Sequence, residues 1–155
     1  MPRLSLAAAA VAVATTGAVF AAGHSDVNPA VKARQSHMTL YAFNIGTLGG
    51  MAQGQIEYDA ETARAAAENL AAVAGLNQDA YWVAGTSNAD IEGTKALPAI
   101  WETPEDYAAK EAGLAEATAA LAAVAGDGLE SLQGAIGPVG QACGACHRAY
   151  RQRDE

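Results

Sequence analysis

The chain has 155 residues, of which 51% are hydrophobic, and this is enough apolar sequence for one compact domain with its own core. It carries 17 acidic and nine basic side chains, which give a formal net charge of −8. A field of this sign repels nucleic acid and anionic membrane surfaces, so neither is expected as a partner.

Residues 1–21 predict a cleaved secretory signal peptide. Arg3 is followed by an uncharged apolar run, and small residues precede a cleavage point after Ala21. A membrane anchor is the alternative, but the run is rich in alanine and only marginally long enough to span a bilayer. We therefore expect export, most simply to a bacterial periplasm, and a single soluble mature domain over 22–155.

The first helix is predicted to begin at Pro29, because Asn28 can cap the end and a proline in the first turn needs no N–H donor. The helix is predicted to end near Gly49 and Gly50. Between these points one helical stripe recurs, made of Val31, Arg34, Met38, Tyr41, Ile45 and Leu48.

A second helix is predicted from the Asp59 cap to Gly75, with acidic residues in its first turn and an alanine-rich body. The segment that follows, 76–102, is rich in glycine, asparagine, aspartate and threonine. It predicts a long ordered connection, whose residues Trp82 and Trp101 should pack on the core as a lid.

The third helix should begin at Pro104 behind a Thr103 cap and stop at Gly126. The fourth carries apolar residues and both cysteines at alternating steps of three and four, and its interior Pro138 should kink or loosen it. Four helices with one long and two short connections predict an all-α fold, an antiparallel four-helix bundle.

The fourth helix holds the motif with the clearest chemistry, C-x-x-C-H, formed by Cys143, Cys146 and His147. This is the attachment pattern for c-type haem, in which two thiols bond to porphyrin vinyl groups and the histidine turns toward the iron. On a helix the two cysteines share one face and can reach neighbouring edges of one macrocycle. The sequence therefore predicts one covalent haem c.

Three other readings of the motif are weaker. A thioredoxin-type redox pair would follow a strand, and no strand is predicted here. A disulfide between helical residues so close together would be strained. A zinc site would need a fourth ligand, and the other histidines, His24 and His37, lie far up the chain.

From about Pro29 to Arg151 the chain resembles cytochrome c′, the class II c-type cytochromes. The resemblance is carried by "VKARQSHMTL" in the first helix, "EYDAETARA" at the second, "AGTS" and "AIW" in the connection, "AGDG" before the last helix, and "CGACHRAYR". It implies a left-handed four-helix bundle, often a homodimer, with haem between the helices near one end.

The resemblance also implies roles for individual residues. His147 is the only iron-binding histidine, and Met38 seals the opposite face of the haem. Arg34 lies near the haem propionates, and Arg151 lies beside the proximal histidine, four residues on and on the same helical face. For Arg34 a solvated charge is the alternative.

The leading functional prediction is a periplasmic haem protein, not an enzyme, with a five-coordinate high-spin iron that binds nitric oxide or carbon monoxide and can pass electrons. Apolar walls without hydrogen-bond donors would favour nitric oxide over dioxygen. The alternative is a six-coordinate, low-spin electron carrier of the cytochrome c-556 kind, with Met38 as second axial ligand and a redox partner protein. Met51 is a lesser thioether candidate, and His37 is expected to be a solvated surface residue.

Overall fold

The structure is a computed structural model that describes residues 27–153, so the predicted signal peptide and His24 lie outside the described residues. Its elements are α1 (Pro29–Ala52), α2 (Ala60–Ala74), the 3-10 helix η1 (Asp79–Tyr81), α3 (Ala99–Glu102), α4 (Pro104–Ala122) and α5 (Leu129–Tyr150).

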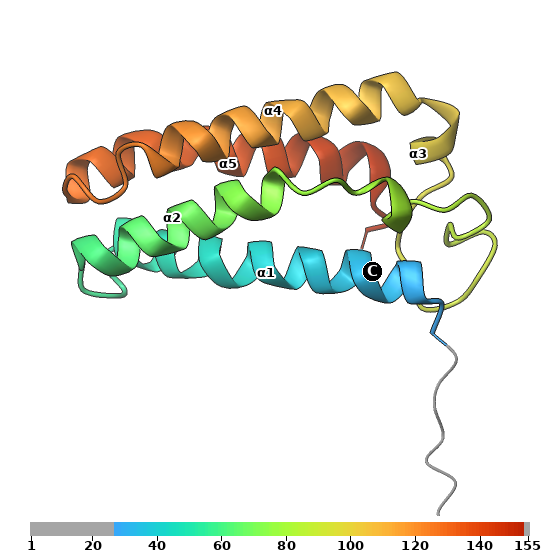
Figure 1. Ribbon diagram of the computed structural model, residues 1–155, viewed down its shortest axis with the longest axis horizontal. Coiled ribbons are helices and arrows are strands. Elements are labelled where there is room, and N and C mark those ends of the chain that lie inside the picture. The colour runs from blue at the N-terminus through green and yellow to red at the C-terminus, as the bar shows by residue number, and fades with distance from the viewer. Residues whose placement is uncertain (1–26, 154–155) are drawn as a thin grey trace, which may run out of the picture.

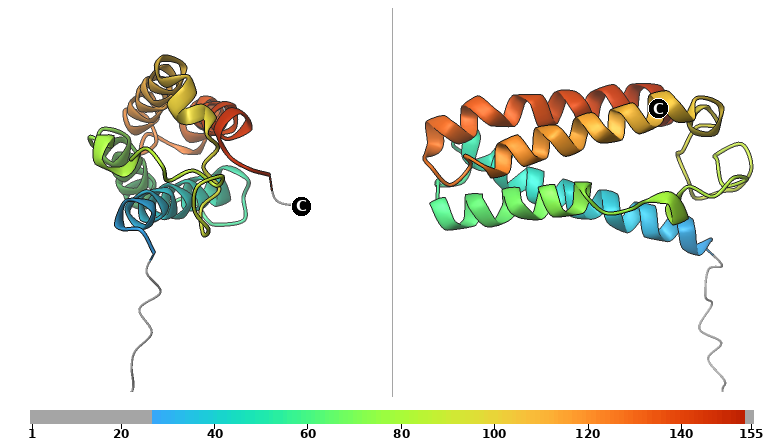
Figure 2. Two further views of the ribbon diagram at one scale, coloured as in Figure 1. Left: turned by 90° about the vertical axis from the view of Figure 1, so that its right-hand side faces the viewer. Right: turned by 45° about the horizontal axis from the view of Figure 1, so that its top comes forward.

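The four long helices run antiparallel in a bundle, with two short turns at one end and the long connection at the other (Figure 1). Seen along the bundle, they surround a common interior (Figure 2). Both α1 and α4 contact α2 and α5. The all-α four-helix prediction is confirmed. Within residues 27–153, none of the helices is long and apolar enough to cross a membrane.

The helix starts predicted from local signals are found at α1 and α2. The Asn28 side chain accepts hydrogen bonds from two backbone N–H groups of the first turn, and Pro29 takes the first helical position. Asp59 accepts from the Thr62 N–H at 2.8 Å, which also lowers the pKa of its carboxyl group. The α2 helix ends at its Gly75 cap.

The α1 helix ends later than predicted, and tertiary packing explains the difference. The helix continues through both glycines to Ala52, because Met51 is buried in the core and Ile56 packs on the helix from beyond its end. A Cβ atom at Gly50 would lie 2.6 Å from Ile56 Cδ1, so only glycine permits this close approach.

Two further expectations about helix ends need correction. Thr103 precedes α4 but gives it no side-chain cap; its hydroxyl donates instead to the Ala99 carbonyl. The α4 helix ends at Ala122, before Gly126. Despite its interior Pro138, α5 is one helix over its whole length.

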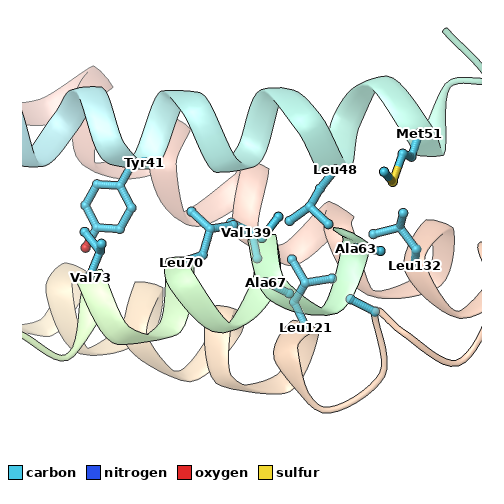
Figure 3. Close-up of a cluster of buried hydrophobic side chains, with 12 residues drawn as sticks. Tyr41, Leu48, Met51, Ala63, Ala67, Leu70, Val73, Leu121, Leu132 and Val139 are labelled. Atoms are coloured by element: carbon cyan, nitrogen blue, oxygen red, sulfur yellow. The ribbon is translucent and has the colours of Figure 1, made fainter. Parts of the chain in front are cut away.

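The main core lies toward the end with the short turns. Each long helix gives it one leucine that is almost fully buried, and these are Leu48, Leu70, Leu121 and Leu132 (Figure 3). A smaller cluster of Ile100, Tyr107 and Tyr150 closes the other end, with both tryptophans packed against it as the predicted lid. The division leaves room for a cavity at the end with the long connection.

Candidate functional site

A cavity of about 650 Å³ lies at this end, bounded by α1, the long connection and the end of α5. Its size falls within the roughly 300–1,000 Å³ typical of small-molecule and cofactor sites. One wall is the 82–96 loop, the part of the long connection between η1 and α3 that contributes Trp82 and residues 93–96.

The 82–96 loop is fastened to α5 through backbone groups. Ala96 and Arg151 form an isolated antiparallel bridge. Beside it, the Gln152 N–H donates to the Lys95 carbonyl at 2.8 Å. On the other side of the cavity, Gln35 Nε2 of α1 donates to the Gly93 carbonyl at 2.7 Å. The loop therefore joins the first and last helices across the cavity.

Arg34 also connects α1 to the 82–96 loop, and its side chain is only 3% exposed. Its Nη1 donates to Thr86 Oγ1 at 2.8 Å, its Nη2 donates to Thr94 Oγ1 at 2.7 Å and to the Thr86 carbonyl, and its guanidinium lies over the Trp82 ring. Burial lowers the pKa of this guanidinium. Because its donors hold the 82–96 loop, the alternative of a solvated charge is wrong.

The C-x-x-C-H motif occupies the last two turns of α5. Cys146 lines the cavity, and half-buried Cys143 packs against the main core one turn earlier. The two thiols are not joined to each other. Burial raises the pKa of both thiols, and that of Cys146 rises to about 11, with the negative charge of Glu111 adding to the effect of burial. Both are therefore neutral thiols at pH 7.

His147 also lines the cavity, next to Cys146. Much of His147 is exposed to solvent, and burial of the remainder, followed by the positive charge of Arg151, lowers the pKa of its imidazole. The neutral imidazole that results is the form that binds a metal ion. Arg151 lies in the cavity wall as well, and its backbone N–H donates to the His147 carbonyl at 3.1 Å.

Met38 enters the cavity wall from α1 and is half-buried. The structure thus gathers five of the six predicted site residues around one cavity, and the sixth, Cys143, lies one helical turn away. The five are Arg34, Met38, Cys146, His147 and Arg151.

Charge in the cavity wall differs from charge in the whole chain. Among residues 27–153, the wall includes Arg34, Lys95 and Arg151 but no aspartate or glutamate, although acidic residues outnumber basic ones in the sequence. Aromatic and aliphatic side chains supply much of the rest, among them Trp82 and Ile100. A flat apolar ring with anionic substituents, such as haem, fits this combination of wall groups.

Two tyrosines in the wall, Tyr107 and Tyr150, were not predicted as site residues. Their ring centroids are 5.3 Å apart, in an edge-to-face arrangement. Tyr150 follows Cys146 by one helical turn, so the spacing along α5 could have indicated it. Tyr107 comes from α4, and only the folded chain brings it to the cavity.

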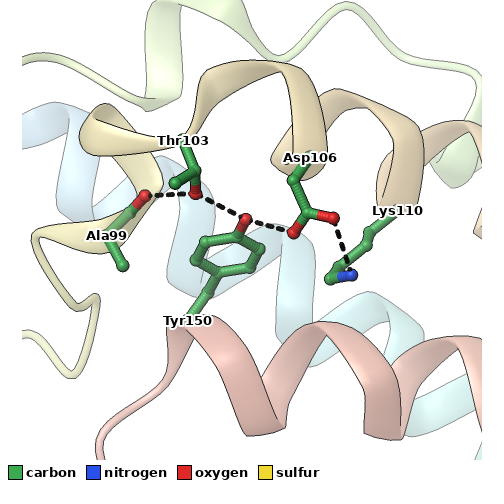
Figure 4. Close-up of polar contacts among 5 residues, drawn as sticks. All are labelled: Ala99, Thr103, Asp106, Lys110 and Tyr150. Carbon is green, nitrogen blue, oxygen red and sulfur yellow. Dashed lines mark hydrogen bonds and ion pairs between the residues drawn. The ribbon is translucent and has the colours of Figure 1, made fainter.

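A polar network fixes the start of α4 against the end of α5 (Figure 4). The Tyr150 hydroxyl donates to Asp106, which also accepts from Lys110 Nζ at 3.1 Å, and Thr103 Oγ1 lies 2.8 Å from the same hydroxyl. These bonds lower the pKa of Asp106. They hold the last turn of α5, and hence the motif, in place.

The prediction of a solvated His37 is wrong. The residue is 4% exposed and lies between the rings of Tyr41 and Tyr81, with centroids 4.8 and 5.8 Å away. Burial lowers its pKa, and its Nε2 has no hydrogen-bond partner among the described residues. The cause is η1, which covers this face of α1. Met51 is buried in the main core and does not line the cavity.

Within residues 27–153, no three histidine, cysteine, aspartate or glutamate side chains gather in a way that could hold a metal ion. The zinc reading of the motif therefore gains no support. A four-helix bundle with C-x-x-C-H in the wall of a cationic, partly aromatic cavity defines instead the c-type, haem-binding class of bundle.

Comparison with known families agrees with this class. The sequence model described as Cytochrome C′ matches residues 29–151, and the chain belongs to this family. The assignment places it among haem proteins that are not enzymes.

Individual relatives and solved structures support the same assignment. The chain is 42% identical over 124 residues to cytochrome c-554 of Cereibacter sphaeroides, covering 80% of this chain and 81% of that protein. A solved cytochrome c′ from Rhodobacter spheriodes superposes with a TM-score of 0.79 at 37% identity, covering 81% of this chain and 96% of that one. A nitric oxide complex of a variant cytochrome c prime from Alcaligenes xylosoxidans gives 0.69 at 37% identity, with 81% and 94% covered.

Proposed function

We propose that this protein carries one haem c bound through Cys143 and Cys146, with His147 as axial ligand, and that it binds nitric oxide or carbon monoxide on the other face of the iron. The observation that carries the proposal is the cavity itself, which has Cys146 and His147 in one wall and Met38 in the wall from α1. Bound haem would supply an iron centre that can take a diatomic ligand or exchange one electron.

The chain's own groups suit each part of this role. The neutral imidazole of His147 is the protonation state that iron ligation requires. Lys95 and Arg151 bring positive charge for the haem carboxylates, and Arg34 adds charge while it holds the 82–96 loop.

Two polar side chains near Met38 on α1 already donate hydrogen bonds to the protein, whereas Trp82 Nε1, in the same cavity wall, has no hydrogen-bond partner among the described residues. Thr39 Oγ1 donates to the Gln35 carbonyl at 2.9 Å, and Gln35 Nε2 donates to the Gly93 carbonyl at 2.7 Å. Bound dioxygen gains from a distal hydrogen-bond donor, whereas nitric oxide binds iron strongly without one. A distal face on which the Met38 thioether offers no hydrogen-bond donor would therefore favour nitric oxide.

Met38 also carries the second candidate function. Its side chain lines the same cavity as His147, and a thioether can bind haem iron and raise its reduction potential. In that case the protein would be a six-coordinate, low-spin electron carrier that serves a redox partner protein. In both cases we propose that the chain works in the periplasm after removal of residues 1–21.

Optical spectra of the purified mature protein test the proposal. The ferrous form is expected to show a broad high-spin Soret band that shifts on addition of nitric oxide or carbon monoxide. Sharp, split low-spin bands that resist carbon monoxide would instead assign Met38 as an iron ligand. Protein exported together with a working haem-attachment system but lacking any haem spectrum would contradict both functions.

We further propose that two copies pair through the outer face of α1. Leu40 is 50% exposed and Phe43 is 72% exposed, and both lie on the face that also carries Gly46. Large apolar side chains presented together to water are typical of an interface. Because Gly46 has no side chain, the helix of a second copy could approach α1 closely at this position.

Phe43→Asp should therefore convert a dimer into a monomer, because it would bury a carboxylate at the centre of the contact. Sedimentation equilibrium of the haem-loaded protein would measure the change. Leu76→Asp, at a leucine beyond α2 that is as exposed as Leu40, is the control and should leave the dimer intact. A wild-type monomer at high protein concentration would rule out this pairing.

A further inference from the structure

A second, smaller cavity opens on another side of α4. It has a volume of about 240 Å³ and lies between the end of α2, residues 76–79 and the middle of α4. Its polar wall groups are Asn77, Gln78, Asp79 and Glu111, and none of these lines the larger cavity.

Glu111 is the inner polar group of this small cavity. The residue is half-buried, and its Oε1 atom is buried without a hydrogen-bond partner among the described residues. A buried carboxylate oxygen without a partner is costly, because the charged form has lost its hydration. Burial accordingly raises the pKa of Glu111 above its ordinary value.

Tyr107 stands between Glu111 and the larger cavity. It precedes Glu111 by one turn of α4, and it lines the cavity that we assign to haem. Burial raises the pKa of Tyr107, of Tyr41 on α1 and of Cys146 on α5, and the negative charge of Glu111 adds to each of these shifts. The carboxylate therefore lies near a residue that would carry the haem.

The other charged and titratable groups around Glu111 act as follows. A hydrogen bond with the Tyr107 side chain lowers the pKa of Glu111, and the negative charge of Asp79, the first residue of η1, raises it. On its own helix, Lys110 pairs with Asp106 at 3.1 Å. From α5, Cys143 acts on Tyr41 and Cys146 but is not among the groups that shift Glu111. From α2, only Ala74 contributes to the small cavity.

We propose that Glu111 is a proton-binding site that exchanges with solvent through the small cavity and takes up one proton when the haem iron gains one electron. The step is balanced: an external one-electron donor reduces ferric iron to ferrous iron, and a solvent proton binds one carboxylate oxygen of Glu111. The added electron makes a second negative charge nearby more costly, and in a poorly hydrated interior this repulsion is strong. The proposal rests on the proposed haem attachment.

The test is the reduction potential of the full haem-loaded protein as a function of pH. Between the pKa values of Glu111 in the ferric and ferrous forms, the ratio of reduced to oxidised protein at a fixed potential should fall up to tenfold per pH unit, which equals about 59 mV. Glu111→Gln should remove this dependence while other titrating groups keep theirs. Glu116→Gln, at an exposed glutamate of the same helix, is the matched control and should retain it. Equal slopes in wild type and Glu111→Gln would overturn the proposal.

An infrared difference spectrum between the two redox states gives an independent readout on the wild type. Reduction should add a protonated carboxyl band that is missing in Glu111→Gln, and the absence of such a band in the wild type would overturn the proposal even if the variant folded poorly. If the haem assignment were wrong, the result would be distinguishable from failure of the Glu111 proposal, because a chain without haem would show no redox couple at any pH. A low-spin, six-coordinate iron would change the optical spectrum and leave this test valid.

Discussion

Replacing Cys143 and Cys146 together with alanine is expected to abolish covalent haem attachment completely. The two thiols are the only cysteines in the sequence, so no other side chain can form a thioether. The mass of the intact denatured protein should fall by one haem, and acidified organic solvent should extract any haem that remains. Haem retained by the denatured double variant would contradict the assignment.

The single variants separate the two positions. Cys146 lines the cavity, while Cys143 lies one turn away against the main core. Each alanine variant should keep one thioether and hence a haem that survives denaturation. Because the leucine core lies toward the other end of the bundle, we expect all these variants to keep their helical circular dichroism.

Met38→Ala is expected to raise the affinity for carbon monoxide by roughly 5- to 150-fold if Met38 only fills space. A ligand entering the wild-type site must push aside a packed side chain, which costs about 1–3 kcal/mol. If the thioether binds the iron, the same variant should convert a low-spin spectrum into a high-spin one. Flash photolysis of the carbon monoxide complex, together with the ferrous spectrum, measures both effects.

Met51→Leu is the matched control for this substitution. Met51 is buried in the main core and does not line the cavity, so a substitution of similar volume there should change neither the affinity nor the spectrum. An unchanged affinity together with an unchanged spectrum in Met38→Ala would contradict both roles of Met38.

The parts of the fold that could be predicted are those that depend on contacts between residues close together in the sequence. The starts of α1 and α2 follow from a capping side chain close to the first turn, and such contacts span only a few residues. The end of α1 did not follow, because Ile56 and the buried Met51 decide it through packing. His37 was misplaced for the same reason, since η1 covers it from a distant part of the chain.

The candidate site shows the same limit. The C-x-x-C-H spacing and the family resemblance indicated residues on α1 and α5, and the structure brings these helices to one cavity. The binding partners of Arg34 could not be predicted, because they lie in a loop without regular structure. Glu111 was also missed, since its place in the wall of the small cavity depends on how α4 packs on the other elements.

The hydrogen bonds of Arg34 have a consequence for the order in which parts of the chain fold. Its hydrogen bonds reach residues 47 to 60 positions away, and the loop it holds is fastened in turn to the end of α5. Contacts between such distant segments form late, because closing long stretches of chain costs entropy before any contact repays it. This end of the bundle therefore closes only after α1, the loop and the end of α5 have come together. Cys146, which lines the cavity there, should remain accessible until this late stage of folding.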